Sequence, residues 1–340
     1  MDNLCHTLVG AALAEAGLRK KSALATATLL IGANIPDVDG ILYWLNRPVE
    51  ALGFRRGWTH GVLAMAVWPF VLAGLMLAWD RWVRLRRHPE REPAAPRVLL
   101  WLALVAVLTH PLLDLCNTYG VRLLMPFSAH WFHGDTLFIV DPWMWLALGL
   151  GWLISRELRR RGSPRPGWPA RWALGIAVAY VAAMAVSNLA ARAIVRSAAA
   201  AEAGPPAGAL MVSPRPLDPF RRDVVIRRDT VYELGSFDWL HRPHYRPEGP
   251  PVERYTGVDA PAVRAAAAAT DQGRIFLAWA RFPVYEVLRS GEGWEVLLAD
   301  ARYTLSGRAR FGAVAIRVPR AVSSPPTSPP PPPHPPQESP

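Results

Sequence analysis

Residues 98–116, VLLWLALVAVLTHPLLDLC, join an unbroken apolar run to two polar side chains, His110 and Asp114. A run of about 20 mostly apolar residues is long enough to cross the hydrocarbon core of a bilayer as a helix. His110 and Asp114 are four residues apart, so a helix places them on one face, one turn apart. At the end of such a span both groups are costly unless they pair or bind a metal. The stretch therefore predicts a membrane helix that carries a polar site at its end.

The N-terminal part of the chain contains several more apolar stretches. Hydrophobic residues make up 51% of the 340-residue sequence, which favours a membrane protein. Longer apolar spans are predicted at 58–79, 98–116 and 172–195, a shorter span at 141–155, and short helices at 3–17 and 22–35. The chain opens with Asp2 in place of a basic segment, which does not fit a signal peptide. We predict a mainly α fold, with a polytopic helical membrane domain over residues 1–200.

Arginine-rich segments set the expected orientation in the membrane. Basic residues outnumber acidic ones, 38 against 27, and they gather at 19–21, 80–97 and 156–171, between apolar stretches. Short loops of this kind face the cytoplasm, so we interpret them as loop charges and expect no nucleic-acid partner. The predicted topology then brings six polar side chains to the opposite, outer face: His6, Asp37, Asp39, His60, His110 and Asp114.

The C-terminal part of the chain has a different character. Residues 201–219 contain several prolines and are predicted to be a linker, and 321–340 are mostly Pro and Ser, which predicts a disordered tail. Between them, 220–320 read as a small β-rich (α+β) soluble domain outside the cytoplasm. Asp259 is expected to cap a short helix after Pro261. Strands are expected at 224–226, 230–234, 275–279, 294–298 and 313–318.

The six polar side chains expected at the outer face are imidazoles and carboxylates. This mixture suits Zn, Mn or Fe better than Ca, which takes oxygen ligands only. It can hold one ion with an open position for water, or two ions about 3.5–4 Å apart. Either arrangement lowers the pKa of bound water and so generates a nucleophile at neutral pH.

Each of these side chains also has a simpler interpretation. Asp37 and Asp39 follow Pro36 and suit a plain turn, and His6 could be satisfied by a backbone carbonyl at the membrane interface. His110 and Asp114 could form a hydrogen-bonded pair between helices. We favour metal ligation because a pair alone would not explain the other ionisable groups on the same face.

The order and context of these residues resemble the YdjM-like family of membrane-bound metal-dependent hydrolases. The matching motifs are His6, Pro36-Asp37-Val38-Asp39, Arg56-Gly57-Trp58-Thr59-His60 and His110-Pro111-Leu112-Leu113-Asp114. The resemblance covers residues 1–200 and implies a hydrolytic activity. The family usually has His where this chain has Arg55, and a guanidinium cannot replace that His as a ligand. The motifs are also similar to a rearranged set from zinc-dependent phospholipase C, which suggests a phosphoester substrate by analogy.

We therefore expect a metal-dependent hydrolase in the inner membrane, acting on a phosphoester or lipid-like substrate at the extracytoplasmic face. Zn is the first choice of metal, with Mn or Fe as alternatives, as one or two ions. Asp39 is a candidate general base, Thr59 an orienting residue, and Arg56 either a group that stabilises negative charge on the substrate or a snorkelling interfacial residue. The expected partners are membrane lipid and a small-molecule or lipid substrate. The expected metal ligands are His6, Asp37, Asp39, His60, His110 and Asp114.

Two other classes of protein remain open from the sequence. An ion- or proton-handling transporter would place its ionisable groups at mid-span, whereas these lie at the ends of the spans. A non-catalytic membrane anchor with a structural metal would have a closed coordination sphere.

Overall fold

A computed structural model of the protein describes residues 1–45, 48–201, 205–291, 293–304 and 312–320. The predicted tail, 321–340, lies outside the described residues. The chain forms two compact units. The first unit comprises Met1–Ile41, Arg55–Asn188 and Ser213–Pro219. The second comprises Leu42–Phe54, Leu189–Val212 and the described residues from Phe220 onward.

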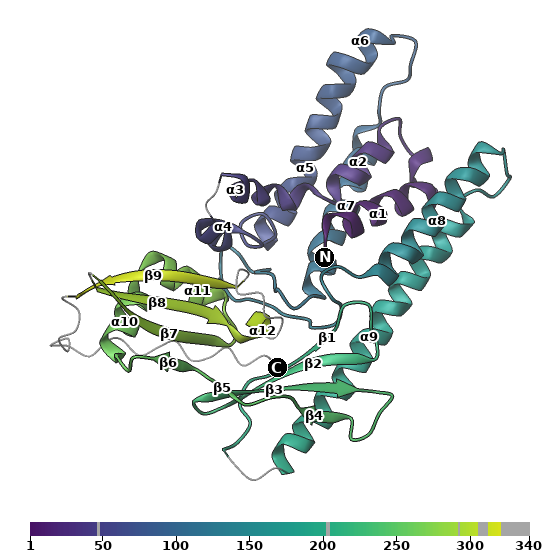
Figure 1. The fold of residues 1–340 in the computed structure, drawn as a ribbon. Helices are drawn as coiled ribbons and strands as arrows, with labels where there is room; N and C mark the ends of the chain where they lie inside the picture. Colours follow the sequence, from purple (N-terminus) through teal and green to yellow (C-terminus); the bar gives the residue numbers. More distant parts are fainter. Residues whose placement is uncertain (46–47, 202–204, 292, 305–311, 321–340) are drawn as a thin grey trace. The chain divides into compact units, whose positions relative to one another are not determined.

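The first unit is helical, which confirms the predicted fold class for this part of the chain (Figure 1). Asp2 begins the first helix by accepting hydrogen bonds from the backbone N–H groups of Leu4 and Cys5, at 3.0 and 3.1 Å. Asp141 begins α8 in the same way. The helices are α1 (Asn3–Glu15), α2 (Ala25–Gly32), α5 (Val62–Trp79), α6 (Leu85–Arg87), α7 (Pro96–Leu115), α8 (Pro142–Arg160) and α9 (Trp168–Ala201), with 3-10 turns at Leu18–Lys20 and Ile35–Gly40.

Three helical segments are long and apolar enough to cross a membrane. They are Val62–Arg87, in which a π-helical turn (Asp80–Arg84) joins α5 to α6, together with α7 and α9. These segments coincide with three of the predicted spans. The predicted shorter span at 141–155 forms the beginning of α8, which does not reach the same apolar character among the described residues, because its last turns carry several charged side chains.

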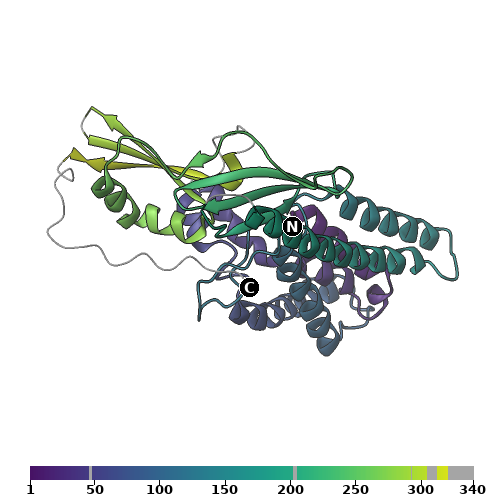
Figure 2. The same cartoon turned by 90° about the horizontal axis from the view of Figure 1, so that it is seen from below.

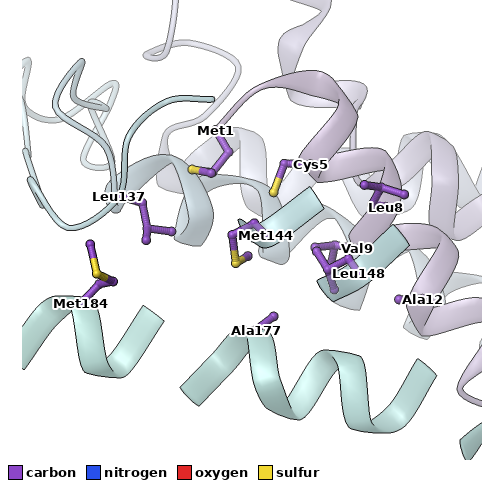
Figure 3. Packing of buried hydrophobic residues seen from close by; sticks show 10 residues of the cluster. All are labelled: Met1, Cys5, Leu8, Val9, Ala12, Leu137, Met144, Leu148, Ala177 and Met184. Atoms are coloured by element: carbon purple, nitrogen blue, oxygen red, sulfur yellow. The ribbon is translucent and has the colours of Figure 1, made fainter. Parts of the chain in front are cut away.

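Helix α1 lies between two groups of helices in the first unit. One of its faces packs against α8 and α9 (Figure 3), and its other face approaches α2, which in turn packs on α5 and α7. Gly10 allows the close approach, because a Cβ atom there would lie 2.7 Å from the backbone oxygen of Leu29. The side chains buried between α1, α8 and α9 are Met1, Cys5, Leu8, Val9, Ala12, Leu137, Met144, Leu148, Ala177 and Met184.

The second unit contains two sheets, which confirms the predicted α+β character. The first sheet has the order β1-β2-β3-β4, with β5 also paired to β3, and its strands are β1 (Leu210–Pro214), β2 (Arg221–Arg228), β3 (Val231–Asp238), β4 (Tyr245–Pro247) and β5 (Val252–Glu253). The second has the order β6-β7-β8-β9, and its strands are β6 (Tyr255–Gly257), β7 (Pro283–Ser290), β8 (Gly293–Asp300) and β9 (Ala313–Pro319). Strands β6 and β7 are parallel, and the neighbouring pairs β7–β8 and β8–β9 are antiparallel.

Helices accompany the second sheet. Figure 2 shows α10 and α11 along one side of it. The C-terminal part of α9 packs its buried residues against the first sheet. The remaining helices of the second unit are α3 (Ile41–Trp44), α4 (Pro48–Phe54), α10 (Pro261–Ala269), α11 (Asp271–Trp279) and α12 (Ala301–Thr304).

Three local expectations differ from the structure. The strand predicted at 275–279 is wrong, because these residues belong to helix α11: Thr270 caps it by accepting a hydrogen bond from Gly273 N at 3.0 Å. Asp259 does not cap α10, since its carboxylate accepts a hydrogen bond from Arg264 at 3.0 Å. Within the predicted linker at 201–219, Leu210–Pro214 form strand β1 of the first sheet.

Replacing Gly10 with Ala should lower the thermal stability of the protein. The new Cβ would meet the carbonyl of Leu29, and overpacking of this kind costs about 1–3 kcal/mol. Gly74→Ala in α5 is the matched control, because its Cβ meets nothing within 4 Å and should be neutral or stabilising by up to about 1 kcal/mol. Labelling of the buried thiol of Cys5 during heating reports unfolding. Equal melting temperatures for the two variants would contradict the close α1–α2 contact.

Candidate metal centre

Four side chains from three separated parts of the first unit meet at one point. Asp37 comes from the 3-10 turn Ile35–Gly40, His60 from the turn before α5, and His110 and Asp114 from successive turns of α7. Each offers one ligand atom, and these atoms all lie within 4.8 Å of one another. The side chains of His60, His110 and Asp114 are 0% exposed, and that of Asp37 is 5% exposed.

The hydrogen bonds of His110 define which ring nitrogen faces the cluster. Its Nδ1 lies 2.7 Å from the backbone oxygen of Ala33. A carbonyl oxygen only accepts hydrogen bonds, so Nδ1 carries the proton and donates it. The other nitrogen, Nε2, then presents its lone pair toward Asp37, Asp114 and His60.

The protonated ring nitrogen of His60 can be assigned in the same way, through its hydrogen bond with Thr59. Thr59 Oγ1 lies 2.6 Å from Asp39 Oδ2 and 2.8 Å from His60 Nδ1. A carboxylate only accepts, so the hydroxyl donates its proton to Asp39 and accepts the proton of His60 Nδ1. Thus Nε2 of His60 also presents a lone pair to the cluster. This chain, Asp39 to Thr59 to His60, fixes the orientation and the tautomer of the imidazole.

The two lone pairs face each other across a short distance. His60 Nε2 and His110 Nε2 are 3.1 Å apart, a contact that is favourable only when a proton or a metal cation lies between the two nitrogens. A tetrahedral zinc ion with Zn–N bonds of about 2.0–2.1 Å separates its two nitrogens by about 3.3 Å. Asp114 Oδ2 lies 3.3 and 3.4 Å from the two nitrogens, and Asp37 Oδ1 lies 3.7 Å from each.

The carboxylates of the cluster have unused hydrogen-bonding capacity. Both oxygens of Asp37 and Oδ2 of Asp114 are buried without a hydrogen-bond partner among the described residues. Buried polar atoms of this kind are normally satisfied, so the donor set fits a divalent cation. Burial alone would raise the pKa of Asp37, but the neighbouring His110 imidazole outweighs burial, and the pKa is lowered below its usual value. Asp37 is therefore a carboxylate, the form that binds metal.

Two further predicted ligands lie beside the four-residue cluster. The ring of His6 stacks on that of His110, with centroids 3.8 Å apart, and its Nε2 lies 3.4 Å from Asp114 Oδ1. Asp39 uses Oδ2 to accept hydrogen bonds from Thr59 and from the backbone N–H of Arg56. Asp39 thus orients neighbouring groups, and ligation by Asp39 and by His6 stays a prediction.

Arg56 is buried and holds Asp114 in place. It is 1% exposed, and its Nη2 lies 3.1 Å from Asp114 Oδ1, which also receives the amino group of Met1. Its Nη1 donates to Asn117 Oδ1 at 3.1 Å, and its guanidinium lies 4.9 Å from the ring centre of Tyr119. These contacts make Arg56 a positioning residue for a carboxylate of the cluster. Sequence reasoning missed Asn117 and Tyr119, although both follow Asp114 closely in the chain.

Arg55 lies closer to solvent than Arg56. Its side chain is 26% exposed, and its guanidinium approaches Asp37 Oδ1 and Asp39 Oδ1, each at 3.9 Å. It therefore adds a positive charge at the more exposed edge of the cluster, next to Asp37.

The family described as YdjM inner membrane protein matches residues 1–191. The chain belongs to this family. The match includes every residue of the candidate metal centre and ends before β1, the first strand of the second unit's sheets. It confirms the resemblance expected from the motifs, and with the apolar helices it supports a membrane location for this YdjM family member.

The chain is also similar to the protein YfhP of Bacillus subtilis (strain 168), which is described as uncharacterized. The YdjM family member is 27% identical to it over 156 residues, which cover 43% of this chain and 44% of YfhP. The chain therefore matches less than half the length of that relative. No solved structure matches the chain.

Removing a ligand from the centre should remove the metal from this YdjM family member. We expect His110→Ala and Asp37→Ala to lose most of the divalent metal that co-purifies with the full chain, as measured by elemental analysis. His88→Ala is the control, because its side chain is 48% exposed, outside the cluster. Full metal content in both ligand variants would contradict the ligand assignment.

Thr59 provides a finer test of the hydrogen-bond chain. Thr59→Val keeps the shape of the side chain but removes the hydroxyl that joins Asp39 to His60, and losing such a partner typically lowers metal affinity about 10–100-fold. Thr59→Ser keeps the hydroxyl and should retain most of the affinity. Competition with a chelator measures both values. Equal affinities for the Val and Ser variants would show that Thr59 does not orient His60.

Proposed function

We propose that this protein is a membrane-bound metal-dependent hydrolase that acts on a phosphoester of a lipid-like substrate. The observation that carries the proposal is the pair of imidazole nitrogens, His60 Nε2 and His110 Nε2, which lie 3.1 Å apart beside two carboxylates. Membership of an inner membrane family supports a substrate that is found at the membrane. The arginine-rich loops between the apolar helices favour the outer face as the site of reaction.

The residues of the cluster suit one divalent ion. His60, His110, Asp37 and Asp114 would hold it, with zinc the first choice for a nitrogen and oxygen donor set, and manganese or iron as alternatives. When bound, such an ion polarises a phosphoryl oxygen and lowers the pKa of water. In the two-ion alternative, His6 and Asp39, which lie beside the four ligands, would bind the second ion.

The remaining polar groups have distinct roles in this proposal. Asp39 Oδ1 is buried without a hydrogen-bond partner among the described residues, so it is the oxygen that would accept a proton. Thr59 keeps His60 oriented. Arg56 is occupied by Asp114, whereas Arg55 is partly exposed and meets Asp37, so Arg55 is better placed than Arg56 to attract negative charge on a substrate.

A structural metal is the second candidate function. Three of the four ligand side chains are fully buried, and such burial is also found in closed, non-catalytic sites. A structural metal would stabilise the fold without any hydrolysis. The cluster lies at the end of α7 and before the start of α5, away from mid-span, which speaks against a transport pathway.

Hydrolysis of a soluble phosphodiester tests the proposed activity. The metal-loaded full chain should hydrolyse bis(p-nitrophenyl) phosphate, and a chelator should abolish the reaction. Asp37→Asn and His110→Ala should lower kcat by more than about a hundredfold, since even partners outside the coordination sphere cost 10–100-fold. His88→Ala should keep full activity. A metal-containing protein that hydrolyses neither this ester nor phospholipid esters would instead support the structural metal.

A further inference from the structure

A groove of about 520 Å³ opens beside the candidate metal centre. It lies within the first unit, among the first turns of α1, the end of α2 and the 3-10 turn Ile35–Gly40. Four of the eight residues that line it are apolar, namely Leu30, Ile31, Ile35 and Val38, and Asp37 is the charged residue among them. The exposed lining of the groove is mainly apolar.

Asp37 links this groove to the metal centre. Of the four cluster side chains, Asp37 alone has exposed surface, while those of His60, His110 and Asp114 are 0% exposed. Asp37 also lines the groove. Asp37 is therefore the residue that the groove and the cluster share, although both of its carboxylate oxygens are buried. The guanidinium of Arg55, 3.9 Å from Asp37, supplies a positive charge at the same point.

The walls of the groove favour an apolar occupant. Ile31 is 45% exposed and Val38 is 51% exposed, so both present hydrocarbon surface for contact. The polar side chains of the wall largely satisfy each other: the Asn34 amide donates to Thr7 Oγ1 at 3.0 Å and to the backbone oxygen of Leu30 at 2.9 Å. Contact with these walls would bury apolar surface, which is favourable in proportion to its area.

We infer that this groove binds the hydrocarbon chain of an amphiphilic substrate whose phosphate group reaches the metal centre at Asp37. This inference rests on the proposed function and adds where the substrate binds and why it must carry a chain. Leu4, which is 48% exposed on the first turn of α1, adds apolar surface next to the groove-lining Asn3. A small hydrophilic phosphoester would use only the metal and Arg55, and would gain nothing from the groove.

Alkylphosphonates test the groove without requiring any reaction, because their P–C bond is not hydrolysed. The probes are methylphosphonate and hexylphosphonate, bound to the metal-loaded full chain in lipid nanodiscs, with empty nanodiscs as the blank. Hexylphosphonate should bind about thirtyfold more tightly, as expected from burying about half of its additional methylene groups. Hydrolysis of bis(p-nitrophenyl) phosphate and metal content are measured on the same preparations.

Ile31→Asn is the informative variant, because Ile31 lines the groove without touching the metal ligands. It should weaken hexylphosphonate binding at least fivefold and leave methylphosphonate binding and metal content unchanged. Ile41→Asn is the matched control, since Ile41 is 59% exposed and does not line the groove.

The outcomes separate the groove from the activity. Equal affinities for the two phosphonates, binding of neither, or equal effects of Ile31→Asn and Ile41→Asn would overturn the assignment of the groove. Preferential binding of hexylphosphonate by a protein that hydrolyses no phosphoester would support the groove and overturn the hydrolase.

Discussion

Among the four side chains of the cluster, the closest polar contact is the 3.1 Å approach of His60 Nε2 and His110 Nε2. Both imidazoles donate the N–H of Nδ1 away from this contact, His110 to the backbone oxygen of Ala33 and His60 to Thr59 Oγ1. Two imidazole nitrogens are thus held against each other inside a helical unit, which is unfavourable unless a proton or a metal cation lies between them. The rest of the site follows from this constraint, because the carboxylates around the pair supply the negative charge that a divalent ion requires.

The buried charges of the site also explain the two adjacent arginines. Asp37, Asp39 and Asp114 are carboxylates in or beside the cluster, and burying them without partners would be costly. Arg56 forms an ion pair with Asp114 on the buried side of the cluster. Arg55 forms longer ion pairs with Asp37 and Asp39 on the more exposed side. Neighbouring residues of the same type thus differ in role because one side chain is enclosed and the other reaches the edge. Arg56 adopts a positive φ of 51° in making this arrangement.

Access divides the site into two parts. The imidazoles and Asp114 are enclosed by α7 and its neighbours, whereas Asp37 lies on a 3-10 turn that also forms the wall of the apolar groove. A metal held in this way would be enclosed by the imidazoles and Asp114 and would adjoin the groove at Asp37. Such an arrangement suits a reaction on a group carried by an apolar chain, because the chain and the reacting group need opposite environments.

Local patterns in the sequence predicted the apolar helices, the α+β character of the C-terminal part and the four side chains of the candidate cluster, because hydrophobic periodicity and residue chemistry are local properties. They failed at α11, where the apolar run 275–279 suits either a strand or a helix and the cap at Thr270 favours the helix. They could not separate Asp37 from Asp39, or Arg55 from Arg56, because spacing along the chain does not reveal which side chain turns toward the imidazoles. Only the packing of the 3-10 turn, the turn before α5 and the end of α7 made those distinctions, since burial and hydrogen-bond partners arise from contacts between residues distant in the chain.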